Sequence, residues 1–248
     1  MKNLLIFSLA TTLLFSCKKE EISTLQTELD NSGISLSEEY IIACAAGMRN
    51  GFMGDVAHPV SMFFYPVEGA TNFRYFESAG NNINEWDYAQ YQEVIVTSVP
   101  VFNGYLRRFP LKKANNRWGI VTYEVNGKTR ICDPVHIKVD FQQTVWSPNR
   151  ITITEIGLTP EFKWQPYPIF ENVIHFNVVS DSNKNLISGT YTADTNWNFY
   201  DLSNVTLNIR DVNPVPSLDS NSTYTFTLMS VSDDNWVTTF GQKEFKTP

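Results

Sequence analysis

The chain has 248 residues, 42% of them hydrophobic and 14% aromatic, and a formal net charge of −7 at pH 7. This composition indicates a chain that buries a core. An acidic chain without a basic block argues against binding to nucleic acid, or to an anionic membrane surface through charge.

The first sixteen residues have the pattern of a secretory signal peptide. Lys2 precedes a short apolar run at residues 4–14. Signal peptides have about 7–15 apolar residues in this position, whereas a membrane-spanning helix needs about 20. We therefore predict that residues 1–16 are cleaved off, and no later stretch of the sequence has the length and apolarity of a membrane span.

Leu14-Phe15-Ser16-Cys17 resembles the lipobox of bacterial lipoproteins. The resemblance implies that Cys17 becomes the N-terminus and carries lipid on its sulfur. An ordinary signal peptide, with Cys17 as a bystander, is the alternative. Two or more acyl chains hold a protein on a membrane for practical purposes.

The next four residues, KKEE at 18–21, are similar to export signals of lipoproteins displayed on the outer membrane. The resemblance implies a lipid-anchored protein exposed at the cell surface, and a solvated charge run is the alternative. Residues 18–37 hold few large apolar side chains and no helical stripe. This predicts that residues 17–37 are the lipidated cysteine and a flexible tether.

Residues 38–142 and 146–248 each have the length of one β-sandwich. Short β-rich runs alternate with turn signals, and TYTFTLMSV at 223–231 places apolar and polar residues on opposite faces. VSMFFYPVEGATNFRYFES at 60–78 indicates two strands around a turn, and Asn126-Gly127 indicates a tight hairpin turn. Residues 79–116 show no clear strand pattern. The fold class is therefore all-β, with two tandem sandwiches.

Residues 146–248 resemble a fibronectin type III domain. FKWQPYP at 162–168 is similar to the second strand of that family, and the resemblance places Trp164 in the core. SLDSNSTYTFTLMSV at 217–231 is similar to its penultimate strand, with Leu218 six residues before Tyr224. This spacing is that of the tyrosine corner, in which the hydroxyl reaches back to upstream backbone. Residues 38–142 resemble a more divergent immunoglobulin or fibronectin type III-like sandwich.

Two cysteines remain when Cys17 is lipidated. A disulfide between Cys44 and Cys132 would persist outside the cytoplasm and would constrain the unfolded chain. Both residues lie in apolar, strand-like runs, so two separately buried thiols are the alternative.

The sequence contains no recognisable motif for catalysis or metal binding. The three histidines lack metal-ligand spacing, and no phosphate loop or nucleophile elbow is present. The oxygen-rich stretches 181–185 and 232–236 lack the glycine and glutamate of a calcium loop, and they are typical of turns. We therefore expect no enzyme activity, no metal and no cofactor.

Three tryptophans are candidates for a ligand-binding face. Trp86, Trp197 and Trp236 lie among Asn, Asp and Thr residues, where an exposed ring could stack on a sugar. The alternative is a ring packed on the end of a sandwich with its N–H toward water.

The sequence thus predicts a non-catalytic, lipid-anchored envelope protein that binds another envelope or surface protein, or acts as a scaffold for one. The alternative is a surface glycan-binding accessory lipoprotein of a polysaccharide uptake system. An exposed tryptophan platform would favour the glycan. A broad apolar patch or an open sheet edge would favour a protein partner.

Overall fold

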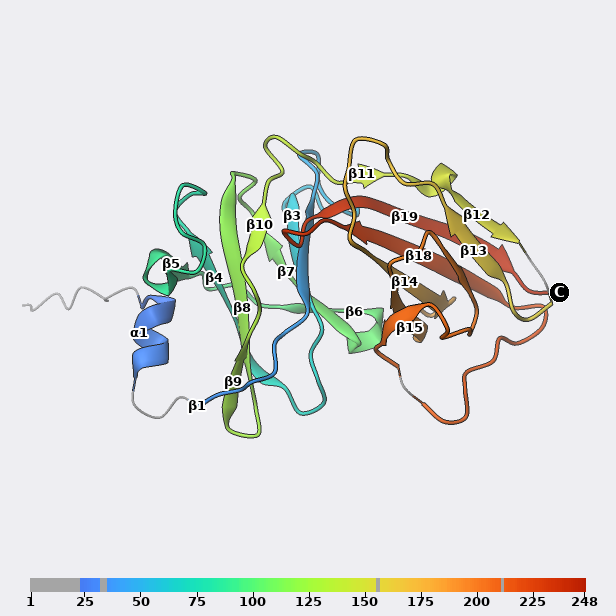
Figure 1. Cartoon of the computed structure of the whole chain (residues 1–248), viewed down its shortest axis with the longest axis horizontal. Helices are drawn as coiled ribbons and strands as arrows, with labels where there is room; N and C mark the ends of the chain where they lie inside the picture. The colour runs from blue at the N-terminus through green and yellow to red at the C-terminus, as the bar shows by residue number, and fades with distance from the viewer. Residues whose placement is uncertain (1–22, 32–34, 155–156, 211) are drawn as a thin grey trace, which may run out of the picture.

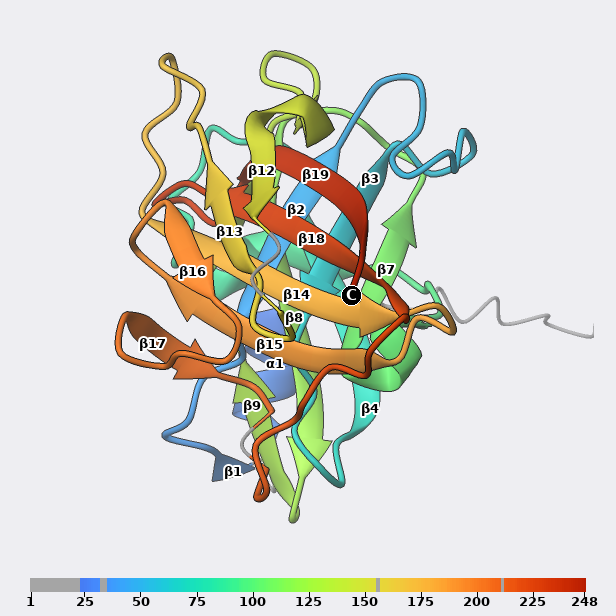
Figure 2. The same ribbon diagram turned by 90° about the vertical axis from the view of Figure 1, so that its right-hand side faces the viewer.

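The computed structural model describes residues 23–31, 35–154, 157–210 and 212–248, and this part of the chain is all-β. Four sheets are stacked along the long axis of the molecule (Figure 1). We number them from the N-terminal end, so that sheets 1 and 2 form the first sandwich and sheets 3 and 4 the second. Figure 2 looks along the stack with sheet 4 nearest the viewer. The prediction of an all-β fold built of sandwiches is confirmed.

The first sandwich contains ten strands of the described chain. Sheet 1 has the order β1 (Ser35–Leu36), β9 (Lys128–Ile131), β8 (Arg117–Val125), β4 (Thr71–Ser78) and β5 (Tyr91–Glu93), with β10 (Val135–Ile137) also paired to β8. Sheet 2 has the order β2 (Ala43–Gly47), β3 (Val60–Phe64), β7 (Leu106–Leu111) and β6 (Val99–Val101).

The second sandwich is built in the same way from a wide and a narrow sheet. Sheet 3 has the order β11 (Val145–Trp146), β19 (Val237–Lys246), β18 (Thr223–Val231), β14 (Ile174–Asp181), β15 (Leu186–Thr192) and β17 (Val205–Asn208). Sheet 4 has the order β12 (Ile151–Thr154), β13 (Glu161–Trp164) and β16 (Asn196–Asn198). The helical segments are short: α1 (Leu25–Asp30), η1 (Tyr88–Gln90), η2 (Phe102–Gly104) and η3 (Pro148–Arg150).

Three apolar layers fill the spaces between the four sheets. Met62 and Tyr75 belong to the layer between sheets 1 and 2, and Phe226 belongs to the layer between sheets 3 and 4. The middle layer joins the sandwiches, because Phe63 of sheet 2 and Phe176 of sheet 3 share one buried cluster. Each inner sheet is therefore covered on both faces.

Strand β3 shows the consequence for the sequence pattern. Val60, Met62 and Phe64 face sheet 1, while Phe63 packs toward sheet 3, and all five residues of the strand are buried. Alternation of apolar and polar residues marks a strand with one solvent face, whereas a strand covered on both faces is a continuous apolar run. The run SMFF has this second form because a neighbouring sandwich covers it.

The second sandwich pairs a three-stranded sheet with a wider sheet. Strands β12, β13 and β16 form one sheet, and β19, β18, β14 and β15 form the other, to which β17 and β11 are added at the edges. Trp164, Leu218 and Tyr224 lie in the core between these sheets. The Asp219 backbone N–H donates to the Tyr224 hydroxyl at 2.8 Å, which is the geometry of a tyrosine corner.

Replacing Tyr224 with phenylalanine is expected to lower the free energy of unfolding by about 1 kcal/mol, because the hydrogen bond between the hydroxyl of this buried side chain and the Asp219 N–H is lost. Urea unfolding of both proteins measures the difference. Tyr105→Phe is the matched control, since Tyr105 is 36% exposed and its hydroxyl makes no hydrogen bond to the described residues. An equal effect of the two substitutions would contradict the corner.

The turn between β18 and β19 extends out of the second sandwich into the first. Its Trp236 is fully buried within the cluster between sheets 1 and 2, beside Ala43 and Ala45. The Ala45 N–H donates to the Asn235 carbonyl at 2.9 Å, so the turn is also tied to the edge of sheet 2. The two sandwiches are thus interlocked as well as stacked.

Asp234 adds an ionic contact to the same turn. Its carboxylate accepts from the Lys138 ammonium at 2.5 Å and lies 3.3 Å from Nδ1 of His136, both in the first sandwich. Burial raises the pKa of the Asp234 carboxyl, but hydrogen bonds from His136, Lys138 and Ser232 outweigh burial and hold the pKa below its usual range. The carboxylate therefore remains charged at neutral pH.

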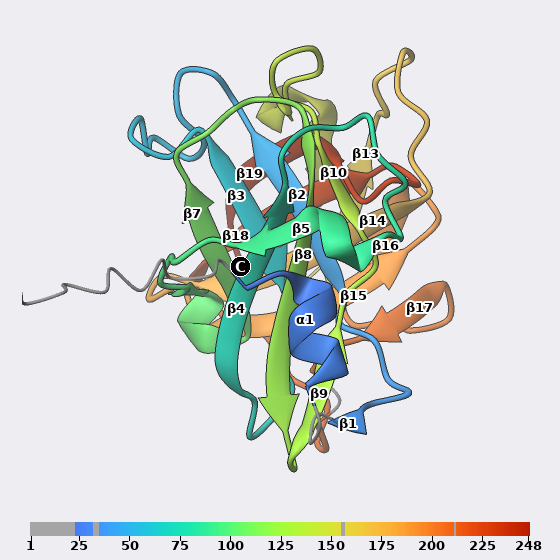
Figure 3. The ribbon, with the colours of Figure 1, turned by 90° about the vertical axis from the view of Figure 1, so that its left-hand side faces the viewer.

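The described part of the N-terminal segment differs from the predicted tether. Residues Leu25–Asp30 form α1, which begins at the capping residue Thr24 and packs its buried Leu25 against the first sandwich. Figure 3 shows α1 lying across the outer face of sheet 1. β1 pairs with β9. The sequence pattern does not predict α1, because a helix of six residues with a single buried leucine has no periodic apolar stripe.

The first sandwich contains the predicted hairpin turn, and it also contains strands in the region for which no strand was predicted. Asn126 and Gly127 both have positive φ and connect β8 to β9, as the dipeptide predicts. Residues 79–116, which showed no strand pattern, contain β5, β6 and β7. β6 has three residues and contains Pro100, so its length and composition conceal it.

Candidate binding pocket at the junction of the sandwiches

The three tryptophans predicted to form a binding face are not brought together. Trp86 is 53% exposed, but Trp197 and Trp236 are buried in different cores. The Trp197 ring stacks on Phe162, and its indole N–H donates to the Asp201 carbonyl at 2.8 Å. The expected exposure of Trp197 and Trp236 is therefore wrong, and no tryptophan platform forms from these three residues.

The disulfide that the sequence left open is not formed. Cys44 lies on β2 and Cys132 follows β9, and both are free. Burial raises the pKa of each thiol to about 12. The Cys132 sulfur accepts a hydrogen bond from the Val121 N–H at 3.1 Å and is buried in the core of the first sandwich.

Native protein treated with a neutral alkylating reagent is expected to react slowly at Cys44 and more slowly at Cys132. The two thiols have similarly raised pKa values, but Cys132 is 2% exposed while Cys44 is less completely covered. Mass spectrometry after digestion measures each site. A mobility shift on reduction, or the absence of both free thiols in the denatured protein, would contradict two unpaired cysteines.

The oxygen-rich stretches serve as turns. Asp181 accepts from both the backbone and the side-chain amide of Asn185, at 2.8 Å each, and closes the β14–β15 turn. Asp234 is used by the ionic contact to the first sandwich. Among the described residues there is no group of three or more His, Cys, Asp or Glu side chains that could hold a metal ion.

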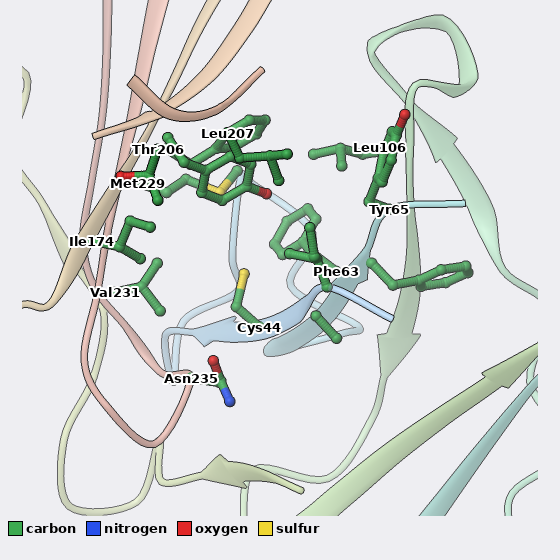
Figure 4. Close-up of a pocket in the computed structure, with 15 residues that line it drawn as sticks. Cys44, Phe63, Tyr65, Leu106, Ile174, Thr206, Leu207, Met229, Val231 and Asn235 are labelled. Carbon is green, nitrogen blue, oxygen red and sulfur yellow. The ribbon is translucent and has the colours of Figure 1, made fainter. Parts of the chain in front are cut away.

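A pocket of about 290 Å³ opens where the sandwiches meet. Strands β2, β3 and β7 of the first sandwich form one wall, and β14, β15, β17 and β18 of the second form the other. Figure 4 shows Ile174 and Val231 on one side and Phe63 on the other, with Cys44 between them. Asn235, from the β18–β19 turn, lies at one end of this space.

The side chains that line this junction pocket are mostly apolar, and none is charged. Its polar groups are the Cys44 thiol, two tyrosine hydroxyls, Thr206 and Asn235. Burial raises the pKa values of Tyr65 and Tyr191, and the nearby Cys44 raises that of Tyr191 further. All these groups are neutral at physiological pH, so the pocket suits binding of an uncharged group and offers no ionised nucleophile.

No sequence pattern predicts this pocket. Its walls come from segments more than 100 residues apart, for example Cys44 and Tyr191. Each segment taken alone has the pattern of an ordinary strand. Only the packing of sheet 2 against sheet 3 brings them together.

Cys17, the predicted lipidation site, lies outside the described residues. No helix among the residues that the structure describes is long and apolar enough to cross a membrane.

No protein-family model matches this chain, and no curated protein matches it. Among solved structures, one that describes neurohormone perception by the receptor tyrosine kinase Torso is similar over 87% of this chain and 76% of that chain, at 11% identity and a TM-score of 0.27. A similarity of this size carries no argument about function, and the fold assignment rests on the strand order described above.

Proposed function

We propose that this chain is a non-catalytic binding or scaffold protein of the bacterial envelope. In this proposal, lipid on Cys17 holds it on the outer membrane with its sandwiches facing the cell exterior, and its partner is another envelope or surface protein. The lipobox-like stretch and the charge run after it support the location. The proposal about the partner rests on an apolar surface formed by two loops.

This loop surface consists of Met53, Val56, Phe141 and Trp146, which are 50%, 73%, 61% and 49% exposed. The first two lie in the β2–β3 loop and the others in and after the β10–β11 loop, beside the sandwich junction (Figure 1). Exposed apolar clusters of this kind are typical of sites that bind proteins.

Hydrogen bonds and ring contacts join the two loops. Arg49 of the β2–β3 loop donates its backbone N–H to the Gln143 side chain at 2.8 Å, and its guanidinium donates to the Asp140 carbonyl. Phe240 then contacts both Trp146 and Phe52, with ring centroids 5.4 and 5.2 Å apart. The two loops that carry the four exposed apolar side chains are therefore connected to each other.

The rigid connection of the sandwiches also suits a scaffold. A partner bound at the junction contacts both sandwiches, whose relative position is fixed by the shared middle layer and by Trp236. A glycan-binding role has less support, because only Trp86 of the three candidate tryptophans is exposed.

Crosslinking on intact cells, with a tag at Pro248, tests the partner. We expect one envelope or surface protein to be captured reproducibly by the wild type, and to be lost when Val56 is replaced by glutamate. Ile95→Glu is the matched control, since Ile95 is 89% exposed and lies outside the loop surface. Equal capture by both variants would contradict the loop surface. If the wild type captures no protein, this would contradict the proposed protein partner and favour the alternative glycan-binding role.

Membrane fractionation of Cys17→Ala tests the anchor. The variant is expected to leave the membrane fraction or to remain unprocessed, because it has no sulfur to carry lipid. Unchanged retention would contradict lipid anchoring without bearing on the loop surface.

A further inference from the structure

We propose that the junction pocket is a second binding site, which takes a neutral, largely apolar small molecule with a hydrogen-bonding group. This inference is independent of the proposed protein partner, because the pocket is lined by other residues than the loop surface.

The charge of the walls selects the class of ligand. The pocket is lined by no Asp, Glu, Lys, Arg or His, so no lining side chain carries a charge that could pair with an ionic ligand. Burying an unpaired charge costs several kcal/mol, whereas burying apolar surface is favourable by about 25 cal/mol per Å². A fatty-acid carboxylate, a phosphate or a charged sugar is therefore disfavoured.

The Tyr191 hydroxyl is one of several polar groups of the pocket that have no hydrogen-bond partner among the described residues. The Tyr191 hydroxyl makes no hydrogen bond to any described residue, whereas the Tyr65 hydroxyl donates to the Ile209 carbonyl at 3.3 Å. The Tyr191 ring is held in place by stacking on Phe176 at 4.4 Å. A fixed ring with a free hydroxyl in an apolar pocket provides one directional contact, which is how small-molecule sites orient a ligand.

The size of the pocket limits the ligand. At about 290 Å³ it lies at the lower end of small-molecule sites, which span about 300–1,000 Å³. It therefore suits a compact aromatic molecule or a short acyl chain better than a whole lipid.

N-phenyl-1-naphthylamine is a suitable probe, because it is neutral, apolar and carries one N–H group. Its sulfonated analogue 8-anilino-1-naphthalenesulfonate has the same ring system with a negative charge. We expect the fluorescence of the neutral probe to saturate with purified wild-type protein, and the charged analogue to bind at least about tenfold more weakly. Equal affinity for the two, or no saturable binding of the neutral probe, would overturn the proposal.

Two variants locate the bound probe. Tyr191→Phe removes only the free hydroxyl and is expected to weaken binding about fivefold, as for one lost hydrogen bond. Leu207→Trp enlarges a half-exposed side chain at the rim and is expected to abolish binding, while Leu202→Trp, at a similarly exposed position outside the pocket, should not change it. Thermal unfolding of each variant establishes that it is folded.

The free thiols give a readout that does not depend on fluorescence. The neutral probe should protect Cys44 from methyl methanethiosulfonate and leave the rate at Cys132 unchanged, because only Cys44 lines the pocket. Binding that neither protects Cys44 nor responds to Leu207→Trp would place the probe elsewhere and overturn the site. If no probe binds but Leu207→Trp abolishes crosslinking on cells, the pocket belongs to the protein interface, which would overturn the small-molecule proposal and leave the proposed function standing.

Discussion

Replacing Trp236 with alanine is expected to lower the free energy of unfolding by about 3–5 kcal/mol, the usual cost of removing a large buried aromatic side chain. Trp236 is fully buried, and the surroundings of its ring belong to the other sandwich. The substitution therefore leaves a cavity in the first core although the residue belongs to the second sandwich. Chemical denaturation with tryptophan fluorescence and circular dichroism as separate probes measures the effect.

The wild type is expected to unfold in a single transition, because the middle apolar layer and Trp236 couple the sandwiches. In Trp236→Ala, the transition is expected to move to lower denaturant concentration. If the coupling between the sandwiches is lost, fluorescence and circular dichroism should report two separate transitions. Trp86→Ala is the matched control, with an expected change within about 0.5 kcal/mol for an exposed side chain. A loss of less than about 1 kcal/mol in Trp236→Ala would contradict the interlocked junction.

The burial of Trp236 could not be predicted from the local sequence. The stretch SDDNW is polar apart from its tryptophan, and local pattern correctly indicates a turn. What covers the ring is an edge of the first sandwich, which is more than 90 residues earlier in the chain. Local sequence encodes the turn, and only tertiary packing decides that its aromatic residue is buried.

The parts of the fold that could be predicted are those with a local signal. The alternation in β18, the Asn126-Gly127 turn and the spacing of Leu218 and Tyr224 each reflect contacts within one hairpin or one corner. The junction pocket has no such signal. Its formation depends on the orientation of two sandwiches, which no single strand specifies.

Acidification from pH 6.5 to pH 4.5 is expected to lower the free energy of unfolding by about 2 kcal/mol through His175 alone. His175 is 3% exposed on β14, and burial lowers its pKa to about 4. In the folded protein the ring therefore stays neutral down to about pH 4, whereas the unfolded chain binds the proton near pH 6.5. The unfolded state binds more protons throughout this window, so stability falls as the pH falls.

His175→Asn tests this dependence. The Asn side chain can replace the hydrogen bond between Nδ1 of His175 and the Ser230 hydroxyl, which is 2.9 Å long, but it does not titrate. The variant loses the contact of the ring with Trp164, so its stability at pH 7 is expected to be lower than that of the wild type. The informative quantity is the loss in free energy of unfolding between pH 6.5 and pH 4.5, which should be about 2 kcal/mol smaller in the variant than in the wild type. A wild-type slope retained in the variant would contradict the assignment of this acid sensitivity to His175.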